Sequence, residues 1–186
     1  VKSLPGVYIG VVMGRHAGFL TASSALLKSK DNDGPHLIFI PEFSFSLDKF
    51  LKSIKGVYNK YGRCVIAVSE GIKNEKNKLF TEKLKKINEF DAHGNIQLSG
   101  SGMLGDFLAN EVKQKLQISR VRADTLGYSQ RSFLGSSSEI DQKEALQIGL
   151  KAVSYSCKFK SSFSVGIKER KSFNDIYKAN FIINKL

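Results

Sequence analysis

The sequence has few cysteines and no long hydrophobic run, and both absences narrow the classes of protein to which it can belong. Its two cysteines, Cys64 and Cys157, belong to no Cys-x-x-Cys pair and no Cys/His cluster, which argues against a zinc site. A disulfide between them stays open, although so few cysteines suit a reducing cytosol. No apolar run approaches the roughly 20 residues that a membrane-spanning helix needs, and residues 1–6 lack the layout of a signal peptide. We therefore expect a cytoplasmic protein without a membrane segment.

The charge is strongly one-sided, with 29 Lys and Arg against 17 Asp and Glu and a net charge of +12. Such an excess favours anionic partners, which include phosphorylated metabolites, nucleic acids and membrane surfaces. Much of the lysine lies in polar stretches such as Lys73–Lys86, where interspersed Glu and Lys are typical of a solvated helix face. The sequence has neither an aromatic-interleaved basic motif nor helix-turn-helix spacing. A nucleic-acid-binding module is therefore kept only as an alternative.

Apolar runs alternate with segments of helical spacing between residues 7 and 71. The pattern predicts strands at Val7–Met13, His36–Ile40 and Cys64–Gly71, and helices at His16–Ser29 and Ser46–Tyr61. Continuous apolar runs suit strands that are buried on both faces. This alternation predicts right-handed βαβ units, and hence an α/β fold of three layers (αβα) with a mainly parallel sheet.

The rest of the chain is less regular. A charged helix or an insertion is expected at Lys73–Ile87, and a turn-rich segment at Asp91–Gly102. The spacing predicts further helices at Gly102–Leu116, Ser136–Ser156 and Ser172–Leu186, and strands at Val121–Gly127 and Ser161–Glu169. No internal repeat or long linker occurs, so we expect residues 1–186 to form a single domain.

Polar residues follow three of the predicted strands, at the edge where open α/β sheets bind ligands. They are Met13-Gly14-Arg15, Ser69-Glu70-Gly71 and Gly127–Arg131, and Arg122 lies on the strand that leads to the third group. The planar fork of arginine suits phosphate oxygens, and a carboxylate accepts hydrogen bonds from sugar hydroxyls. The pattern therefore favours a site for a phosphorylated polyol. For any single arginine, an ordinary surface ion pair is an equal alternative.

Four segments, in this order, resemble phosphofructokinases: "VMGRHAGFLTA" (Val12–Ala22), "LIFIPEFSF" (Leu37–Phe45), "AVSEG" (Ala67–Gly71) and "TLGYSQRS" (Thr125–Ser132). The last segment resembles the pyrophosphate-dependent branch, because Tyr128 stands where common ATP-dependent members have histidine. The resemblance covers most of the chain and is weakest at residues 72–95 and after Ser154. It implies the fold of a fructose 6-phosphate-binding domain and the activity of a cytoplasmic glycolytic transferase. It also implies a homo-oligomer (dimer or tetramer) in a family with allosteric members.

The resemblance assigns roles to individual residues. It implies that Met13, Gly14 and Arg15 hold fructose 6-phosphate, with Arg15 also near the transferring phosphoryl group as a candidate transition-state stabiliser. Glu70 matches the acid that binds the sugar hydroxyls, and the segment that grips the sugar phosphate matches Tyr128, Ser129, Gln130 and Arg131. Arg122 matches an arginine that reaches a 6-phosphate bound mainly by the neighbouring subunit. Family members often have a second such arginine nine residues before that of "MGR", but this sequence has Gly6 there.

Two motifs of the family do not occur in this sequence: the glycine-rich "GGD" loop for the phosphoryl donor and the "TIDND"-like segment with the catalytic base. No residue here matches the base or a Mg²⁺ ligand. We therefore expect this chain, which begins at Val1, to be part of a longer enzyme that holds Mg²⁺ elsewhere. The resemblance implies phosphoryl transfer from pyrophosphate, or alternatively ATP, to the 1-hydroxyl of fructose 6-phosphate, giving fructose 1,6-bisphosphate.

Three further interpretations stay open. Leu98–Leu108 places glycines before a helix, but without a Walker lysine a structural turn is favoured over a phosphate cradle. His16 is expected to pack or to start a helix rather than to act as a base. A non-catalytic regulatory domain of the same fold is the third alternative, against which the joint presence of Arg15, Glu70 and Arg131 argues.

Overall fold

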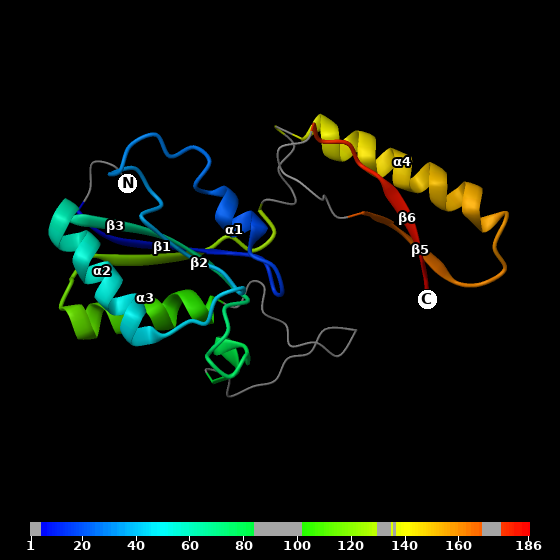
Figure 1. Ribbon diagram of the computed structural model, residues 1–186. Helices are drawn as coiled ribbons and strands as arrows, with labels where there is room; N and C mark the ends of the chain where they lie inside the picture. Colours follow the sequence, from blue (N-terminus) through cyan, green and yellow to red (C-terminus); the bar gives the residue numbers. More distant parts are fainter. Residues whose placement is uncertain (1–4, 84–101, 130–134, 136, 169–175) are drawn as a thin grey trace. The chain divides into compact units, whose positions relative to one another are not determined.

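The computed structural model describes residues 5–83, 102–129, 135, 137–168 and 176–186 (Figure 1). The chain forms two compact units, Val1–Ser132 and Phe133–Leu186, which are described separately. That all 186 residues form one sugar-phosphate-binding domain stays a prediction. Within the described ranges, no helix combines the length and the apolar character that crossing a lipid bilayer demands.

The first unit is built on a parallel sheet of four strands in the order β2-β3-β1-β4. The strands are β1 (Gly6–Val12), β2 (Leu37–Phe39), β3 (Arg63–Ser69) and β4 (Val121–Thr125). The central strand β1 is paired on both sides, with Ile9 opposite Ile66 of β3 and Ala123 of β4. This confirms the parallel sheet that the apolar runs predict.

Helices lie on both faces of this sheet (Figure 1). The helices α2 (Leu47–Tyr61) and α3 (Met103–Leu116) pack on one face, and α1 (Phe19–Ser23) lies against β2 and β3 on the other. The core between the sheet and α2 and α3 includes Ile9, Ile66, Phe50, Ile54 and Leu108, all of them fully buried or nearly so. The predicted three-layer α/β fold is confirmed.

The first helix is shorter than predicted. His16–Ser29 has helical spacing, but the α-helix covers only Phe19–Ser23 and is followed by turns. The hydroxyls of Ser23 and Ser24 donate hydrogen bonds to the carbonyls of Leu20 and Thr21, at 2.7 and 2.6 Å. Hydroxyl groups that bond nearby carbonyls in this way offer the backbone an alternative to further helical turns.

The charged segment after β3 is also largely non-helical. Up to residue 83 it contains only a 3₁₀-helix, Phe80–Lys83, which follows a turn in which the Asn74 side chain accepts hydrogen bonds from two backbone N–H groups. The remainder of Lys73–Ile87 and the segment predicted to be rich in turns lie outside the described residues, except for Gly102.

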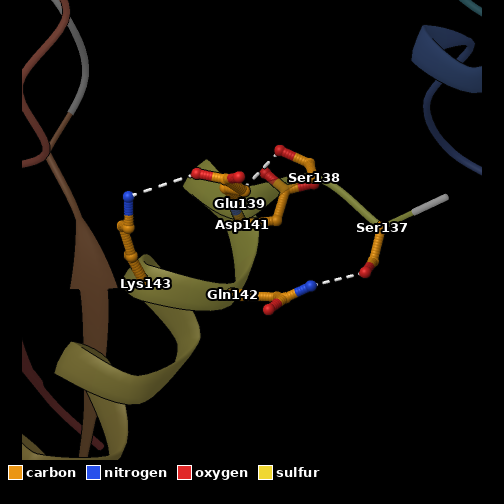
Figure 2. Close-up of polar contacts among 6 residues, drawn as sticks. All are labelled: Ser137, Ser138, Glu139, Asp141, Gln142 and Lys143. Carbon is orange, nitrogen blue, oxygen red and sulfur yellow. Dashed lines mark hydrogen bonds and ion pairs between the residues drawn. The ribbon is translucent and has the colours of Figure 1, made fainter.

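The second unit contains α4 (Glu139–Ser156) and two antiparallel strands, β5 (Phe163–Ile167) and β6 (Phe181–Lys185). Ser138 caps the N-terminus of α4, because its Oγ accepts a hydrogen bond of 3.2 Å from the Asp141 N–H (Figure 2). Figure 2 also shows Gln142 donating to Ser137, and an exposed ion pair of 3.5 Å between Lys143 and Glu139. Exposed pairs at this spacing contribute only about 0.3–0.5 kcal/mol, so the cap is the stronger signal for the start of α4.

The helix predicted at Ser172–Leu186 is wrong. Phe181–Lys185 is the strand β6, in which Ile183 pairs with Val165 of β5. The run Phe181-Ile182-Ile183 is aromatic and β-branched, and such residues fit a pleated, half-buried surface better than a helix. Residues 169–175, which include the start of the predicted helix, lie outside the described part of the chain.

The two cysteines have opposite environments, which predicts their reactivity. Cys64 is fully buried in β3, and Cys157 at the end of α4 is exposed. Burial raises the pKa of the Cys64 thiol to about 12, so the reactive thiolate is scarce at neutral pH. We expect a maleimide to label Cys157 but not Cys64 in the native protein, and both in denaturant, as located by peptide mass spectrometry. Labelling of Cys64 at the native rate of Cys157 would contradict its buried position.

Candidate functional site

The loops that follow β1 and β3 meet at a reversal of the sheet's connections. The chain leaves β1 toward α1 on one face, whereas the chain after β3 leads to α3 on the opposite face. The strands β1 and β3 are neighbours in the sheet, so this reversal lies between their carboxyl ends. Open α/β sheets bind ligands at such a switch point. Met13-Gly14-Arg15 and Ser69-Glu70-Gly71 are placed there, as the sequence predicts.

Three hydrogen bonds join these two loops. The Gly14 N–H donates to Glu70 Oε1 at 3.3 Å, and the hydroxyl of Ser69 donates to the Gly14 carbonyl at 2.6 Å. The Glu70 N–H donates to the carbonyl of Val12 at 2.9 Å. The Glu70 carboxylate is thereby fixed beside the backbone that carries Arg15. A carboxylate accepts up to about four hydrogen bonds, so Glu70 keeps acceptor capacity for a ligand.

Gly71 is required for this close approach. A Cβ at position 71 would lie well inside 3.0 Å of the carbonyl oxygens of Gly14 and Arg15, a separation that real Cβ atoms essentially never show. Both of those atoms belong to backbone, which cannot rotate away as a side chain does. Only glycine therefore allows the loops after β1 and β3 to touch as they do.

Glu42 is a site-positioning residue that the sequence analysis misses. It follows Pro41 after β2, and its Oε1 accepts a hydrogen bond of 2.8 Å from the Gly18 N–H at the start of α1. This contact fixes the direction in which the chain leaves the loop that carries Arg15. The sequence does contain a feature that points to Glu42, because Glu42, like Glu70, is a carboxylate directly after a predicted strand.

The end of β4 brings part of the third predicted group to the same edge. Its Leu126 N–H donates to the carbonyl of Val11 at 2.9 Å, and Ser129 N–H closes a turn on the Leu126 carbonyl at 3.0 Å. Tyr128, in this turn, is 52% exposed. Gln130 and Arg131 lie outside the described residues, so their placement stays a prediction.

Arg122 is not brought together with the other predicted residues. It pairs with Tyr8, four residues before the end of β1. At a rise of about 3.3 Å per residue, that position is about 13 Å from the carboxyl edge. Its side chain lines a separate cavity with Tyr8, Arg120 and Asp124. Burial, and next the carboxylate of Asp124 to which the phenol is hydrogen-bonded, raise the pKa of Tyr8.

The remaining candidate residues are outside or at the margin of this site. His16 is exposed, which does not support packing, and it lies three residues before α1 begins, so a role at the helix start stays a prediction. The glycines before α3 are described only from Gly102 on, so the alternative of a phosphate cradle there is untested. Among the described residues, no three His, Cys, Asp or Glu side chains gather as metal ligands would.

Comparison with known proteins identifies the family of this chain. The family model for phosphofructokinase matches residues 1–156. The pyrophosphate–fructose 6-phosphate 1-phosphotransferase of Rhodospirillum rubrum is 55% identical over 166 residues, which are 89% of this chain and 41% of that protein. The enzyme of the same name from Xanthomonas campestris is 34% identical over 82% of this chain and 35% of its own length.

A solved structure agrees with these sequence matches. The crystal structure of a pyrophosphate-dependent phosphofructokinase from Nitrosospira multiformis matches with a TM-score of 0.69 and 27% identity, over 98% of this chain and 40% of that one. This chain thus spans about two fifths of the length of the relatives that it matches. The resemblance that rests on the four segments is confirmed, and the chain belongs to the phosphofructokinase family.

Proposed function

We propose that this chain is the fructose 6-phosphate-binding part of a pyrophosphate-dependent 6-phosphofructokinase of glycolysis. The observation that carries the proposal is the joined pair of loops at the switch point, which puts the backbone that carries Arg15 beside the carboxylate of Glu70. A carboxylate for sugar hydroxyls and a guanidinium for phosphate oxygens are the two groups that a sugar phosphate needs. The names of the relatives, which specify pyrophosphate and fructose 6-phosphate, support the choice of substrates.

In this proposal the chain positions the sugar and neutralises charge. Glu70 accepts hydrogen bonds from the sugar hydroxyls, and its own bond from Gly14 prevents the carboxylate from turning away. Arg15 stabilises negative charge on the phosphoryl group as it passes to the 1-hydroxyl. Tyr128, Ser129, Gln130 and Arg131 hold the 6-phosphate. Phosphoryl transfer depends mainly on such positioning and charge stabilisation, and the product is fructose 1,6-bisphosphate.

The donor site, the catalytic base and Mg²⁺ belong, in this proposal, to parts of the enzyme outside this chain. Mg²⁺ supplies charge neutralisation between the phosphate oxygens when it is bound. No residue of this chain matches a Mg²⁺ ligand of the family, so the proposal assigns the metal to those other parts. ATP as donor is the alternative within the same class, and assays of the full-length enzyme with each donor decide between them. A cytoplasmic location follows from the proposed glycolytic role.

The proposal also includes a homo-oligomer, a dimer or a tetramer. Arg122 lies about 13 Å below the edge that carries Arg15 and Glu70, further than an arginine side chain extends. If Arg122 binds the 6-phosphate, as the resemblance implies, it must therefore act at the site of a second copy. In a symmetric pair, each copy would give its Arg122 to the site of the other.

Substitution of the two arginines at the site tests the function. Arg15→Ala in the full-length enzyme should lower kcat by about 100-fold or more, because it removes a preorganised group that stabilises the transition state. Arg131→Ala should mainly raise the KM for fructose 6-phosphate. Lys115→Ala, which removes an exposed cation at the end of α3, is the control. Wild-type kinetics in both arginine variants, or salt-dependent nucleic-acid binding that fructose 6-phosphate cannot displace, would contradict the proposal.

Gly71→Ala tests whether the contact between the loops is needed. The added methyl group would push the Gly14–Arg15 backbone away from Glu70, so we expect the KM for fructose 6-phosphate to rise at least tenfold. The matched control is Gly56→Ala in α2, where a Cβ meets no atom within 4 Å. That change should leave the kinetics unaltered. Equal kinetics in the two variants would show that the loops need not touch.

Mixing two defective variants tests the composite site. In our proposal, Arg15→Ala on one copy and Arg122→Gln on the other damage the same site of a mixed dimer and leave its second site intact. Random mixing into dimers makes half of them mixed, each with one intact site, so activity should recover to about a quarter of the wild-type value. Co-expression and purification with two different tags isolates the mixed species. No recovery in the purified mixed oligomer would place Arg122 at the site of its own chain.

A further inference from the structure

The loop that carries Arg15, Gly14–Gly18, is held at both ends by carboxylates. At its first residue, the Gly14 N–H donates to Glu70 Oε1 at 3.3 Å, and at its last, the Gly18 N–H donates to Glu42 Oε1 at 2.8 Å. The two acids follow different strands, because Glu70 comes directly after β3 and Glu42 lies three residues after β2. Hydrogen bonds to an ionised acceptor are about twice as strong as neutral ones, so both contacts hold the loop against the sheet.

The backbone that carries Glu42 is itself fixed. It belongs to a turn, Ile40–Phe43, in which the last N–H donates to the first carbonyl at 3.3 Å. Pro41 occupies the first central position of this turn, where its ring sets the φ that the turn needs. Two residues after the turn, Phe45 lies in the core and its N–H donates to the carbonyl of Lys73 at 2.7 Å. Glu42 therefore reaches Gly18 from a rigid base.

The far end of the Arg15 loop lies directly against the end of β2. Gly18 is buried, and a Cβ at this position would lie 2.4 Å from the Ile40 Cβ and 2.8 Å from Glu42 Oε2. Within the loop, a Cβ on Gly14 would lie 2.6 Å from the carbonyl oxygen of Ala17. The loop is thus folded tightly on itself, and a displacement of Gly18 is passed on to Arg15 through these backbone contacts.

We propose that Glu42 is a positioning residue, which sets the rate of phosphoryl transfer by holding the Arg15 loop and does not touch the substrate. The inference rests on the proposed function, in which Arg15 stabilises charge on the transferring phosphoryl group. Such stabilisation requires a preorganised group, and a misplacement of about 1 Å can cost about 100-fold in rate. Glu70 keeps its own contacts with Gly14 and Val12 when Glu42 is changed. Loss of Glu42 therefore lowers kcat and leaves the KM for fructose 6-phosphate largely unchanged.

Steady-state kinetics of full-length Glu42 variants test the inference. Glu42→Ala removes the acceptor of the buried Gly18 N–H, so we expect kcat to fall about tenfold or more and the KM to change less than about threefold. Glu42→Asp keeps the charge but is one methylene shorter, and kcat should fall similarly. Glu42→Gln keeps the length and a carbonyl oxygen, and most of the activity should remain. Glu75→Ala, which removes an exposed acid in the turn after β3, is the control and should match the wild type.

The Arg15→Ala background shows whether Glu42 acts through Arg15. There, adding Glu42→Ala should lower kcat by less than about twofold, because residues that act as a unit have strongly non-additive effects. An equal loss in both backgrounds would mean that Glu42 acts independently of Arg15 and would overturn the inference. An unchanged kcat in Glu42→Ala, or a raised KM with constant kcat, would overturn it as well.

Hydrogen exchange at the Gly18 amide separates this inference from the proposed function. Exchange, followed by NMR spectroscopy, should become faster in Glu42→Ala and Glu42→Asp but stay slow in Glu42→Gln, because only the first two lose the acceptor. Unchanged exchange in Glu42→Ala overturns the inference, whatever the effect of Arg15→Ala. Wild-type kinetics in Arg15→Ala contradict the proposed function, and exchange at Gly18 then decides whether Glu42 holds the loop.

Discussion

The contact between the backbone of Gly14–Arg15 and Gly71 is the constraint on which the candidate site depends. Parallel pairing of β1 with β3 puts Val12 opposite Ser69, so the residues that follow must pass each other at the same edge. The absence of a side chain at Gly71 lets the two loops come close enough for Gly14 to donate to Glu70. The backbone that carries Arg15 and the carboxylate of Glu70 are thus held next to each other by this geometry.

The same sheet carries positive charge at two separate places. One is the carboxyl edge with Arg15, and the other is the β1–β4 face with Arg120 and Arg122. A rigid parallel sheet does not bend to bring these places together within one chain, because β1 is hydrogen-bonded on both sides along its length. An anion that contacts both must lie between two copies. Within the proposed function, this separation is the reason for expecting an oligomer.

Much of this was predictable from the sequence, for identifiable reasons. Continuous apolar runs predicted β1 and β3, and the rule of strand ends placed Gly14, Arg15 and Glu70 at one edge. The prediction of a terminal helix was wrong, because the pairing of Ile183 with Val165 depends on another strand and not on local spacing. The shortness of α1 arises from Ser23 and Ser24, whose hydroxyls can bond either the helix backbone or solvent. Arg131 stays a prediction.

Arg120 could not be found by motif, since its place depends on a backbone conformation at another strand. In the sequence alone, Gly6 stands where the resemblance leads one to expect an arginine. Its positive φ leaves the space beside β1 to the side chain of Arg120, which directly precedes β4. The space that a side chain at position 6 would fill is therefore occupied by the stem of Arg120. Because a Cβ at position 6 would meet the carbonyl oxygen and the side chain of Arg120, Gly6 and Arg120 are best understood as one feature of the packing between β1 and β4.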